Sequence, residues 1–327
     1  MSHDTAIPTD DLALELRRSW HRFIETFEPL RPELYRYCRG LTRSPWDAED
    51  LVQDTLMRAF STMGDVYPAL RNPRAWLLRV ASNLWIDRLR RTRELALGEL
   101  PEPAAEPQGP SDTRAAAAAL IGDLGPQERA AVLLKDVFDF RLAEIAEVLG
   151  TTTGAVKSAL HRGRGKLSDD ADPKGAERVV PEVLDAFCDA FNARDVERLT
   201  ALVLENGSAA ISGMAGEFGR DAMLDPKTGS LHHTLFSSLD HAVYPELLEG
   251  NRDAPRGELR VVHGEPVMLI WYDHDAGPVV RDVVRFRVED GRVAHILYHF
   301  FSPEVLADVS EELGLPWRSN GYRYVLG

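Results

Sequence analysis

A proline-rich stretch in the first third of the chain sets the strongest limit on how the chain can fold. In LGELPEPAAEPQGPSD, four prolines fall within ten residues, between Pro101 and Pro110, and no hydrophobic periodicity accompanies them. Proline fixes φ, lacks a backbone N–H and disfavours helix at the preceding residue. The stretch, residues 96–112, therefore predicts an extended tether. It separates two segments with helical patterns, residues 12–95 and 113–168.

The sequence changes character after a second, polar linker at residues 169–178. One helix-like segment leads into β-rich runs such as VMLIWY and VVRDVVRFRV, which turn signals such as Glu289-Asp290-Gly291 separate. This order predicts an α+β domain over residues 179–310, followed by a C-terminal tail at residues 311–327. The predicted fold class is multidomain: two all-α modules and then one α+β domain. A length of 327 residues suits two or three domains.

The charge is divided unevenly along the chain. The formal net charge of −14 argues at first against a nucleic-acid partner. However, residues 171–327 hold 26 acidic and 15 basic residues, whereas residues 1–170 hold 26 and 23. Two basic clusters lie in the helical part, within Arg71–Arg93 and Thr151–Leu167. Two separate basic helices predict two contacts with a polyanion.

Cysteine usage and hydropathy restrict the compartment. Cys38 and Cys188 are the only cysteines, so neither a disulfide framework nor a zinc site is expected. We expect no metal and no other cofactor. The N-terminus lacks an apolar signal core, and no apolar run approaches the roughly 18 residues that span a bilayer. We therefore expect a cytoplasmic protein without membrane contact.

The segment SPWDAEDLVQDTLMRAF predicts a helix with an acidic outer face. Ser44 is a suitable N-cap and Pro45 suits the first helical position. Apolar residues recur at the spacing of one buried face. The polar residues predicted to lie near the helix start or outside that face include Asp47, Glu49, Asp50, Gln53 and Asp54. An ordinary solvated helix surface is the alternative interpretation.

The helix NPRAWLLRVASNLWIDRLRR carries a polar face suited to nucleic acid. Arg79, Asn83, Asp87 and Arg90 recur at intervals of four, four and three, so they share one face. Asparagine can read a base edge, arginine binds phosphate or guanine, and a nearby Trp76 can stack on an unpaired base. The alternative is that Trp76 and the neighbouring Trp85 belong to the core.

The segment RLAEIAEVLGTTTGAVKSALHRGRGKL has a helix-turn-helix pattern. Leu142, Ile145 and Leu149 face inward, and Gly150 suits a left-handed helix end before the threonine caps. In the second helix, the residues predicted to pack inward are Ala155, Val156, Ala159 and Leu160. Those left to face a major groove are Thr152, Thr153, Lys157, Ser158, His161 and Arg162. An ordinary helical hairpin is the alternative.

These three segments, in this order, resemble regions 2 and 4 of extracytoplasmic-function (ECF) sigma factors of the sigma-70 family. The resemblance covers residues 14–168 and implies an RNA polymerase sigma factor that directs promoter-specific transcription initiation. It implies two partners, promoter DNA and the RNA polymerase core with its β′ clamp and β subunit. Catalysis then belongs to polymerase, so this chain is not expected to be an enzyme.

The resemblance assigns roles to single residues. Asp47, Glu49, Asp50, Gln53 and Asp54 would dock on the β′ clamp. The minus-10 element would lie against Trp76, Asn83, Asp87, Arg88, Arg90 and Arg91. The minus-35 element would lie against Thr152, Thr153, Lys157, Ser158, His161, Arg162 and Arg164. The acidic tether would run through the polymerase channel where nascent RNA later passes.

The C-terminal half resembles a SnoaL-like, ketosteroid-isomerase-like cone, which one set of ECF sigma factors carries after region 4. Leu100-Pro101-Glu102-Pro103 matches part of a linker motif of that set. The resemblance implies a regulatory domain acting through intramolecular contact with the sigma modules.

Two other functions stay open. One is a one-component helix-turn-helix regulator with a ligand-binding cone, although such a protein needs neither the acidic helix nor the Asn83 helix.

The other open function is that of an isomerase or cyclase-like enzyme fused to a DNA-binding module. Its base would be Asp282, which strand parity turns into an apolar interior, unless a salt bridge to a neighbouring arginine holds it. Possible companions of Asp282 are Tyr244, Tyr272, Tyr298, His295 and His299. His232-His233 is interpreted as part of a polar loop and not as a metal site.

Overall fold

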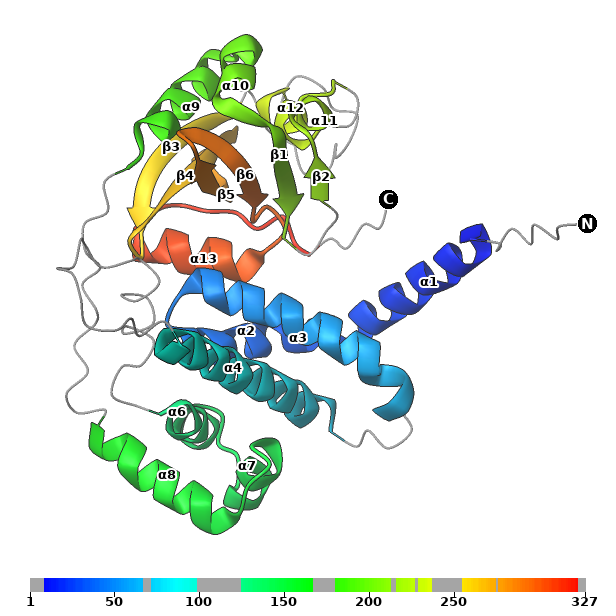
Figure 1. The fold of residues 1–327 in the computed structure, drawn as a ribbon, viewed down its shortest axis with the longest axis vertical. Coiled ribbons are helices and arrows are strands. Elements are labelled where there is room, and N and C mark those ends of the chain that lie inside the picture. The colour runs from blue at the N-terminus through cyan, green and yellow to red at the C-terminus, as the bar shows by residue number, and fades with distance from the viewer. Residues whose placement is uncertain are drawn as a thin grey trace, which may run out of the picture. The chain divides into compact units, whose positions relative to one another are not determined.

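The structure, a computed structural model, consists of two compact units, Met1–Lys174 and Gly175–Gly327 (Figure 1). The described residues are 9–66, 72–98, 125–166, 180–212, 216–226, 229–236, 255–274 and 276–322. The predicted second linker lies outside them, as do residues 99–112 of the proline-rich tether and the last five residues of the tail.

The first part of the first unit is a helical bundle, as predicted. Its elements are α1 (Thr9–Phe27), η1 (Glu28–Leu30), α2 (Arg31–Thr42), α3 (Pro45–Val66) and α4 (Pro73–Gly98). Ser44 caps α3 by accepting from the backbone N–H of Asp47 at 3.3 Å. The predicted apolar stripe of α3, including Leu51, Val52 and Leu56, is buried against α2 and α4.

The second part of the first unit is the predicted helix-turn-helix module. Its elements are α6 (Pro126–Val132), the π-helical turn η3 (Leu133–Val137), α7 (Leu142–Val148) and α8 (Thr153–Lys166). Gly150 has φ +60°, the left-handed conformation expected after α7. Thr152 Oγ1 accepts from the N–H of Ala155 at 3.2 Å and caps α8. Ala155 itself is exposed, so its predicted inward packing is wrong, whereas Val156 and Leu160 are buried.

A buried ion pair joins α2 to α3. Arg31 Nη2 lies 2.5 Å from Glu49 Oε1, with the two side chains 1% and 0% exposed. Gln53 Nε2 also donates to Glu49 Oε1 at 2.7 Å. Because a buried carboxylate is costly without a partner, the pair fixes which side of α3 faces α2.

The second unit is an α+β fold, again as predicted. Its helices are α9 (Glu182–Ala193), α10 (Val196–Leu202), α11 (Arg220–Met223), α12 (Ser230–Phe236) and α13 (Pro303–Glu312). Its strands are β1 (Val203–Ile211), β2 (Gly216–Phe218), β3 (Arg256–Val262), β4 (Glu265–His274), β5 (Gly277–Glu289) and β6 (Arg292–Tyr298).

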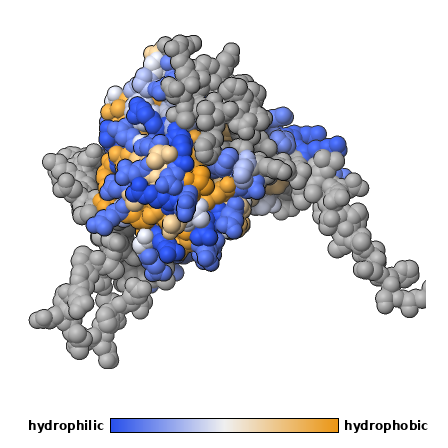
Figure 2. All heavy atoms as spheres, turned by 90° about the horizontal axis from the view of Figure 1, so that it is seen from above, coloured by the Kyte–Doolittle hydropathy of each residue, from blue (hydrophilic) through white to orange (hydrophobic). Residues whose placement is uncertain are grey.

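The strands form one sheet in the order β2-β1-β6-β5-β4-β3 (Figure 1). The β1–β6 pair is parallel and the other neighbours are antiparallel. Helix α9 packs Phe187 and Phe191 into a core shared with Met268, Ile270 and Ile296 of the sheet. Seen from above, Figure 2 shows hydrophilic residues interspersed with hydrophobic ones on the near face of the molecule.

The segment after α13 is part of this unit and not a separate tail. Trp317 forms a parallel bridge with Val280 of β5. Asn320 accepts from Arg281 Nε at 2.8 Å and donates to the carbonyl oxygens of Arg281 and Phe300. Burial lowers the pKa of Arg281 to about 10. The segment around Asn320 therefore closes over a buried guanidinium.

Asp282 lies in the interior, as strand parity predicts. It pairs with Ile270 across the β4–β5 ladder and is 1% exposed. Its Oδ1 has no hydrogen-bond partner within the described part of the chain, and the alternative of a salt bridge is not realised there. Burial raises the pKa of Asp282 well above its usual range, although backbone hydrogen bonds with Val283 and His299 oppose the shift.

Removing the buried carboxylate of Glu49 should destabilise the helical bundle. We expect Glu49→Ala to lower the free energy of unfolding by about 3–5 kcal/mol, because a buried guanidinium loses its carboxylate. The double variant Arg31→Met, Glu49→Leu should lose much less, since it removes both charges together. Urea denaturation of the full chain measures both. Arg58→Ala, at an exposed position of α3, is the control and should change stability by less than about 0.5 kcal/mol.

Asp282→Asn should stabilise the second unit at neutral pH. Because the folded-state pKa of Asp282 is raised, the unfolded chain ionises first as pH rises, and stability is lost between the unfolded and the folded pKa. The variant should therefore gain stability at pH 7 and little at pH 4. Denaturation at both pH values measures this. Asp290→Asn, in an exposed turn with φ +50°, is the control; equal gains at both pH values would contradict the prediction.

Candidate functional site

The acidic face of α3 is narrower than predicted. Asp50 and Asp54 are exposed, and Asp47 and Gln53 are half-buried. The prediction that Glu49 lies on this face is wrong, because Glu49 is 0% exposed and binds Arg31 inside the bundle. The helical spacing alone did not reveal this, because the partner comes from another helix. The exposed acidic face thus consists of Asp47, Asp50, Gln53 and Asp54.

Helix α4 presents the polar residues that the sequence places on one face. Asn83, Arg90 and Arg91 are exposed, and Asp87 and Arg88 are half-buried. Arg90 Nη2 lies 3.3 Å from Asp87 Oδ1, at i,i+3 spacing. This face offers amide, guanidinium and carboxylate groups within about two turns of one another.

The two tryptophans of α4 differ in burial. Trp85 is 2% exposed, so for this residue the alternative of a core position is the correct one. Trp76 is half-buried, and its ring centroid lies 5.8 Å from that of Phe27. Part of Trp76 is therefore accessible at the N-terminal end of α4.

An ion pair links the α3 and α4 faces. Arg88 Nη2 lies 2.7 Å from Asp54 Oδ2, and both side chains remain substantially accessible, at 36% and 60%. The residue predicted to meet polymerase and the residue predicted to meet DNA are therefore direct neighbours. An exposed pair of this kind contributes at most about 1 kcal/mol, so either side chain can exchange its partner.

Helix α8 brings all seven predicted minus-35 residues to the surface. Each of them is exposed: Thr152, Thr153, Lys157, Ser158, His161, Arg162 and Arg164. Both arginines of this set form hydrogen bonds with carboxylates of the same module. Arg162 Nε donates to Glu128 Oε1 at 2.6 Å, and Arg164 Nε donates to Asp136 Oδ2 at 3.0 Å. The hydrogen bond from Arg164 lowers the pKa of Asp136.

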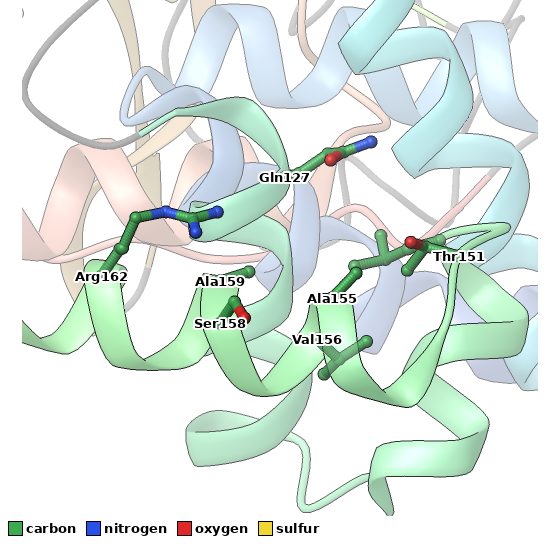
Figure 3. A pocket seen from close by; sticks show the side chains of 8 residues that line it. Gln127, Thr151, Ala155, Val156, Ser158, Ala159 and Arg162 are labelled. Atoms are coloured by element: carbon green, nitrogen blue, oxygen red, sulfur yellow. The ribbon is translucent and has the colours of Figure 1, made fainter.

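Two grooves flank α8. Figure 3 shows the first, of about 270 Å³, between α6 and α8, with Arg162 extending toward α6 at one end and Thr151 at the other. The second, of about 590 Å³, is lined by Leu142, Leu160 and four basic residues. Those four are Lys135, Lys157, His161 and Arg164.

Lys135 is the residue that sequence reasoning missed. It lies in η3, outside the predicted helix-turn-helix, and two nearby acids, Asp136 and Asp139, mask its charge in the sequence. The close packing of η3 against α7 brings it to the groove. A search for single lysines between the apolar residues of the preceding helix would have found it.

The residues considered for isomerase or metal chemistry belong to the second unit. His232-His233 belongs to helix α12, so their assignment to a loop is wrong. Within the described ranges, no three His, Cys, Asp or Glu side chains are grouped so as to hold a metal ion. Tyr298 is buried in the core to which Tyr272 also belongs, and Tyr244 lies outside the described residues. Among the helices that are described, none is long and apolar enough to cross a bilayer.

Comparison with known proteins identifies both helical modules. The family models for Sigma-70 region 2 and Sigma-70 region 4 match residues 10–94 and 114–167. The ECF RNA polymerase sigma factor SigM of Mycobacterium tuberculosis (strain ATCC 25618 / H37Rv) is 30% identical over 160 residues, covering 48% of this chain and 81% of SigM.

Two further comparisons extend beyond these modules. The ECF RNA polymerase sigma factor SigG of the same strain is 34% identical over 214 residues, 54% of this chain and 57% of SigG, so the match spans little more than half of that relative. The crystal structure of the M. tuberculosis ECF sigma factor SigJ is 24% identical, covers 84% of this chain and 95% of that chain, and has a TM-score of 0.30.

The Sigma-70 region 2 match covers the bundle of α2 to α4. The Sigma-70 region 4 match covers the helix-turn-helix of α7 and α8. The chain belongs to the ECF sigma factors of the sigma-70 family.

Proposed function

We propose that this protein binds core RNA polymerase and directs promoter-specific transcription initiation. The observation that carries the proposal is the presence, in one folded unit, of an exposed acidic face on α3 and an exposed basic helix α8. An operator-binding regulator would need the second and not the first. Catalysis of RNA synthesis then belongs to polymerase, and the protein acts in the cytoplasm.

The acidic face supplies the polymerase contact in this proposal. Asp47, Asp50, Gln53 and Asp54 dock on the β′ clamp, and the helix-turn-helix module meets the β subunit. Glu49 acts indirectly, since it is buried and orients α3 through Arg31. Side chains at 60% exposure, such as Asp54, are accessible to a basic partner without refolding.

Promoter recognition is divided between two helices. Helix α4 meets the minus-10 element through Trp76, Asn83, Asp87, Arg88, Arg90 and Arg91. Helix α8 meets the minus-35 element through its seven exposed residues, defined above. Asparagine and arginine read base edges, whereas the flanking lysines and arginines contact phosphate and set the salt dependence.

The second unit is proposed to be a SnoaL-like regulatory cone over residues 179–310, joined to the sigma modules at residues 12–95 and 113–168 by the two linkers. The packing of α9 against β3 and β6 of the six-stranded sheet supports this assignment. Most of the net negative charge of the chain lies in this half. The cone therefore presents a surface that can bind the basic helices within the same molecule and compete with DNA.

Reversing the charge of the acidic face should weaken polymerase binding. We expect the double variant Asp50→Lys, Asp54→Lys to lower the affinity for core polymerase at least tenfold, because two attractive contacts become repulsive. Binding of the full chain to purified core polymerase is measured by fluorescence anisotropy. Asp185→Lys, Asp189→Lys makes the same charge change at the same spacing on exposed positions of α9 and is the control. Equal loss in both variants, or no binding by the wild type, would refute the role of the face.

Promoter selection should depend separately on α4 and α8. We expect Arg162→Ala to weaken use of the minus-35 element and Asn83→Ala to weaken use of the minus-10 element, each by about five- to a hundredfold. In vitro transcription with core polymerase on promoters mutated in one element at a time measures this. Arg198→Ala, on the exposed side of α10, is the control. Unchanged promoter selection in both variants would show that these roles are wrong.

A further inference from the structure

The larger of the two grooves described beside α8 is basic, and η3 contributes to it. Its volume is about 590 Å³, and two apolar and four basic residues line it: Leu142, Leu160, Lys135, Lys157, His161 and Arg164. Three of the four basic residues belong to the set proposed to contact the minus-35 element. Lys135 is the member of this basic groove to which the proposed function gives no role.

The groove between α6 and α8 has a different character (Figure 3). Its lining includes one charged residue, Arg162, and Arg162 Nε donates to Glu128 Oε1 at 2.6 Å. The other polar lining residues, Gln127, Thr151 and Ser158, are neutral. The positive charge beside α8 is therefore concentrated in the basic groove.

The ammonium group of Lys135 is held in position by two contacts. Lys135 Nζ donates to the carbonyl oxygen of Phe140 at 3.2 Å and lies 3.4 Å from Asp139 Oδ1. The side chain of Lys135 is 32% exposed, whereas that of Asp139 is 98% exposed. An ammonium group has three N–H donors, and among the described residues these two are its partners. One donor is therefore left for an external acceptor.

The backbone that carries Lys135 has an uncommon conformation. The N–H of Phe138 donates to the carbonyl oxygen of Leu133 at 3.1 Å, an i→i+5 bond that defines the π turn η3. Asp139, which follows, has a left-handed φ of +53°, a value that is uncommon outside glycine, asparagine and aspartate. Single π turns occur frequently at functional sites. Here the turn brings an ammonium group and an exposed carboxylate to the same point of the surface.

We propose that the basic groove binds the sugar–phosphate backbone of one DNA strand and that Lys135 contacts a phosphate there. The proposal rests on the proposed function, in which α8 lies in the major groove of the promoter. That groove is about 12 Å wide and a helix with its side chains is about 10–12 Å across, so the two flanks of α8 face the two phosphate strands. The flank with the basic groove meets its strand through charge. The flank between α6 and α8 meets the other strand through neutral side chains such as Gln127 and Thr151.

In the free protein, the carboxylate of Asp139 takes the place of that phosphate. The pair of Lys135 and Asp139 is largely open to solvent, so it is weak and a phosphate oxygen can replace the carboxylate. Asp136 has the same part toward Arg164, whose Nε donates to it at 3.0 Å. Two cations of the basic groove are thus oriented before DNA binds, and their carboxylate partners are exchanged when it does.

The proposal is tested by the salt dependence of DNA binding. The full chain, alone and with core polymerase, binds a fluorescent promoter duplex or a duplex of scrambled sequence, and anisotropy gives the affinity at several salt concentrations. Each phosphate contact contributes about 0.9 to the slope of log K against log [salt]. We expect Lys135→Ala to lower the slope by about 0.9 and to weaken binding to both duplexes by the same factor, about three- to tenfold at 0.1 M salt. Lys135→Arg keeps the charge and should keep the slope.

Asp139→Asn should act in the opposite direction. We expect it to tighten DNA binding about two- to fivefold, because Lys135 loses a competing carboxylate, and asparagine tolerates the left-handed backbone. In the Lys135→Ala background the same substitution should have a much smaller effect. Arg198→Ala removes one positive charge from an exposed position of α10 and is the control, with an unchanged slope.

An unchanged slope in Lys135→Ala that circular dichroism shows to be folded would overturn the phosphate contact. A loss confined to the promoter duplex would also overturn it, because phosphate contacts carry no sequence information. Equal effects of Asp139→Asn in both backgrounds would overturn the part given to Asp139. If core polymerase does not bind, the proposed function fails, while the free chain on the scrambled duplex still decides the role of the basic groove. Binding of neither duplex, with or without polymerase, would overturn both.

Discussion

The buried pair of Arg31 and Glu49 is the interaction on which the geometry of the bundle depends. It lies between α2 and α3, where both charges are removed from water, so the two helices can pack in only one rotational setting. That setting turns Asp50 and Asp54 outward and brings Asp54 to Arg88 of α4. The proposed polymerase face and the proposed minus-10 face thus share one internal support.

Several arginines that we propose to contact DNA already have carboxylate partners. Arg88 binds Asp54, Arg162 binds Glu128 and Arg164 binds Asp136. These pairs orient the guanidinium groups without removing them from solvent, and each is weak enough to be exchanged for a phosphate. In the proposed function, a protein with a net charge of −14 can still contact DNA through α8, because most of the acidic excess lies in residues 171–327. Binding should accordingly fall steeply with salt.

The second unit is held together by a different kind of polar contact. The ladder between β4 and β5 is irregular at Ile270 and Trp271, and on β5 the adjacent residues Arg281 and Asp282 are both buried. Asn320, 39 residues further on, satisfies Arg281, whereas Asp282 has an oxygen without a partner in the described residues. Burial raises the pKa of this carboxyl group and costs stability, and the described residues hold no group of three His, Cys, Asp or Glu that could bind a metal ion.

Sequence patterns determined the local features correctly because their signals lie within one or two turns: the Ser44 cap, the apolar stripe of α3, Gly150 at φ +60° and the exposed face of α8. Strand parity likewise placed Asp282 inside. Only the tertiary structure decided what depends on distant partners. Glu49 is buried because Arg31 meets it from another helix, Lys135 reaches the basic groove because η3 packs on α7, and Asn320 joins the sheet through Arg281. The contacts between the two helical modules belong to the same class. Arg74 donates to the carbonyl oxygen of Phe138, 64 residues away, and Arg129 donates to that of Leu41, 88 residues away, and no local periodicity relates these pairs.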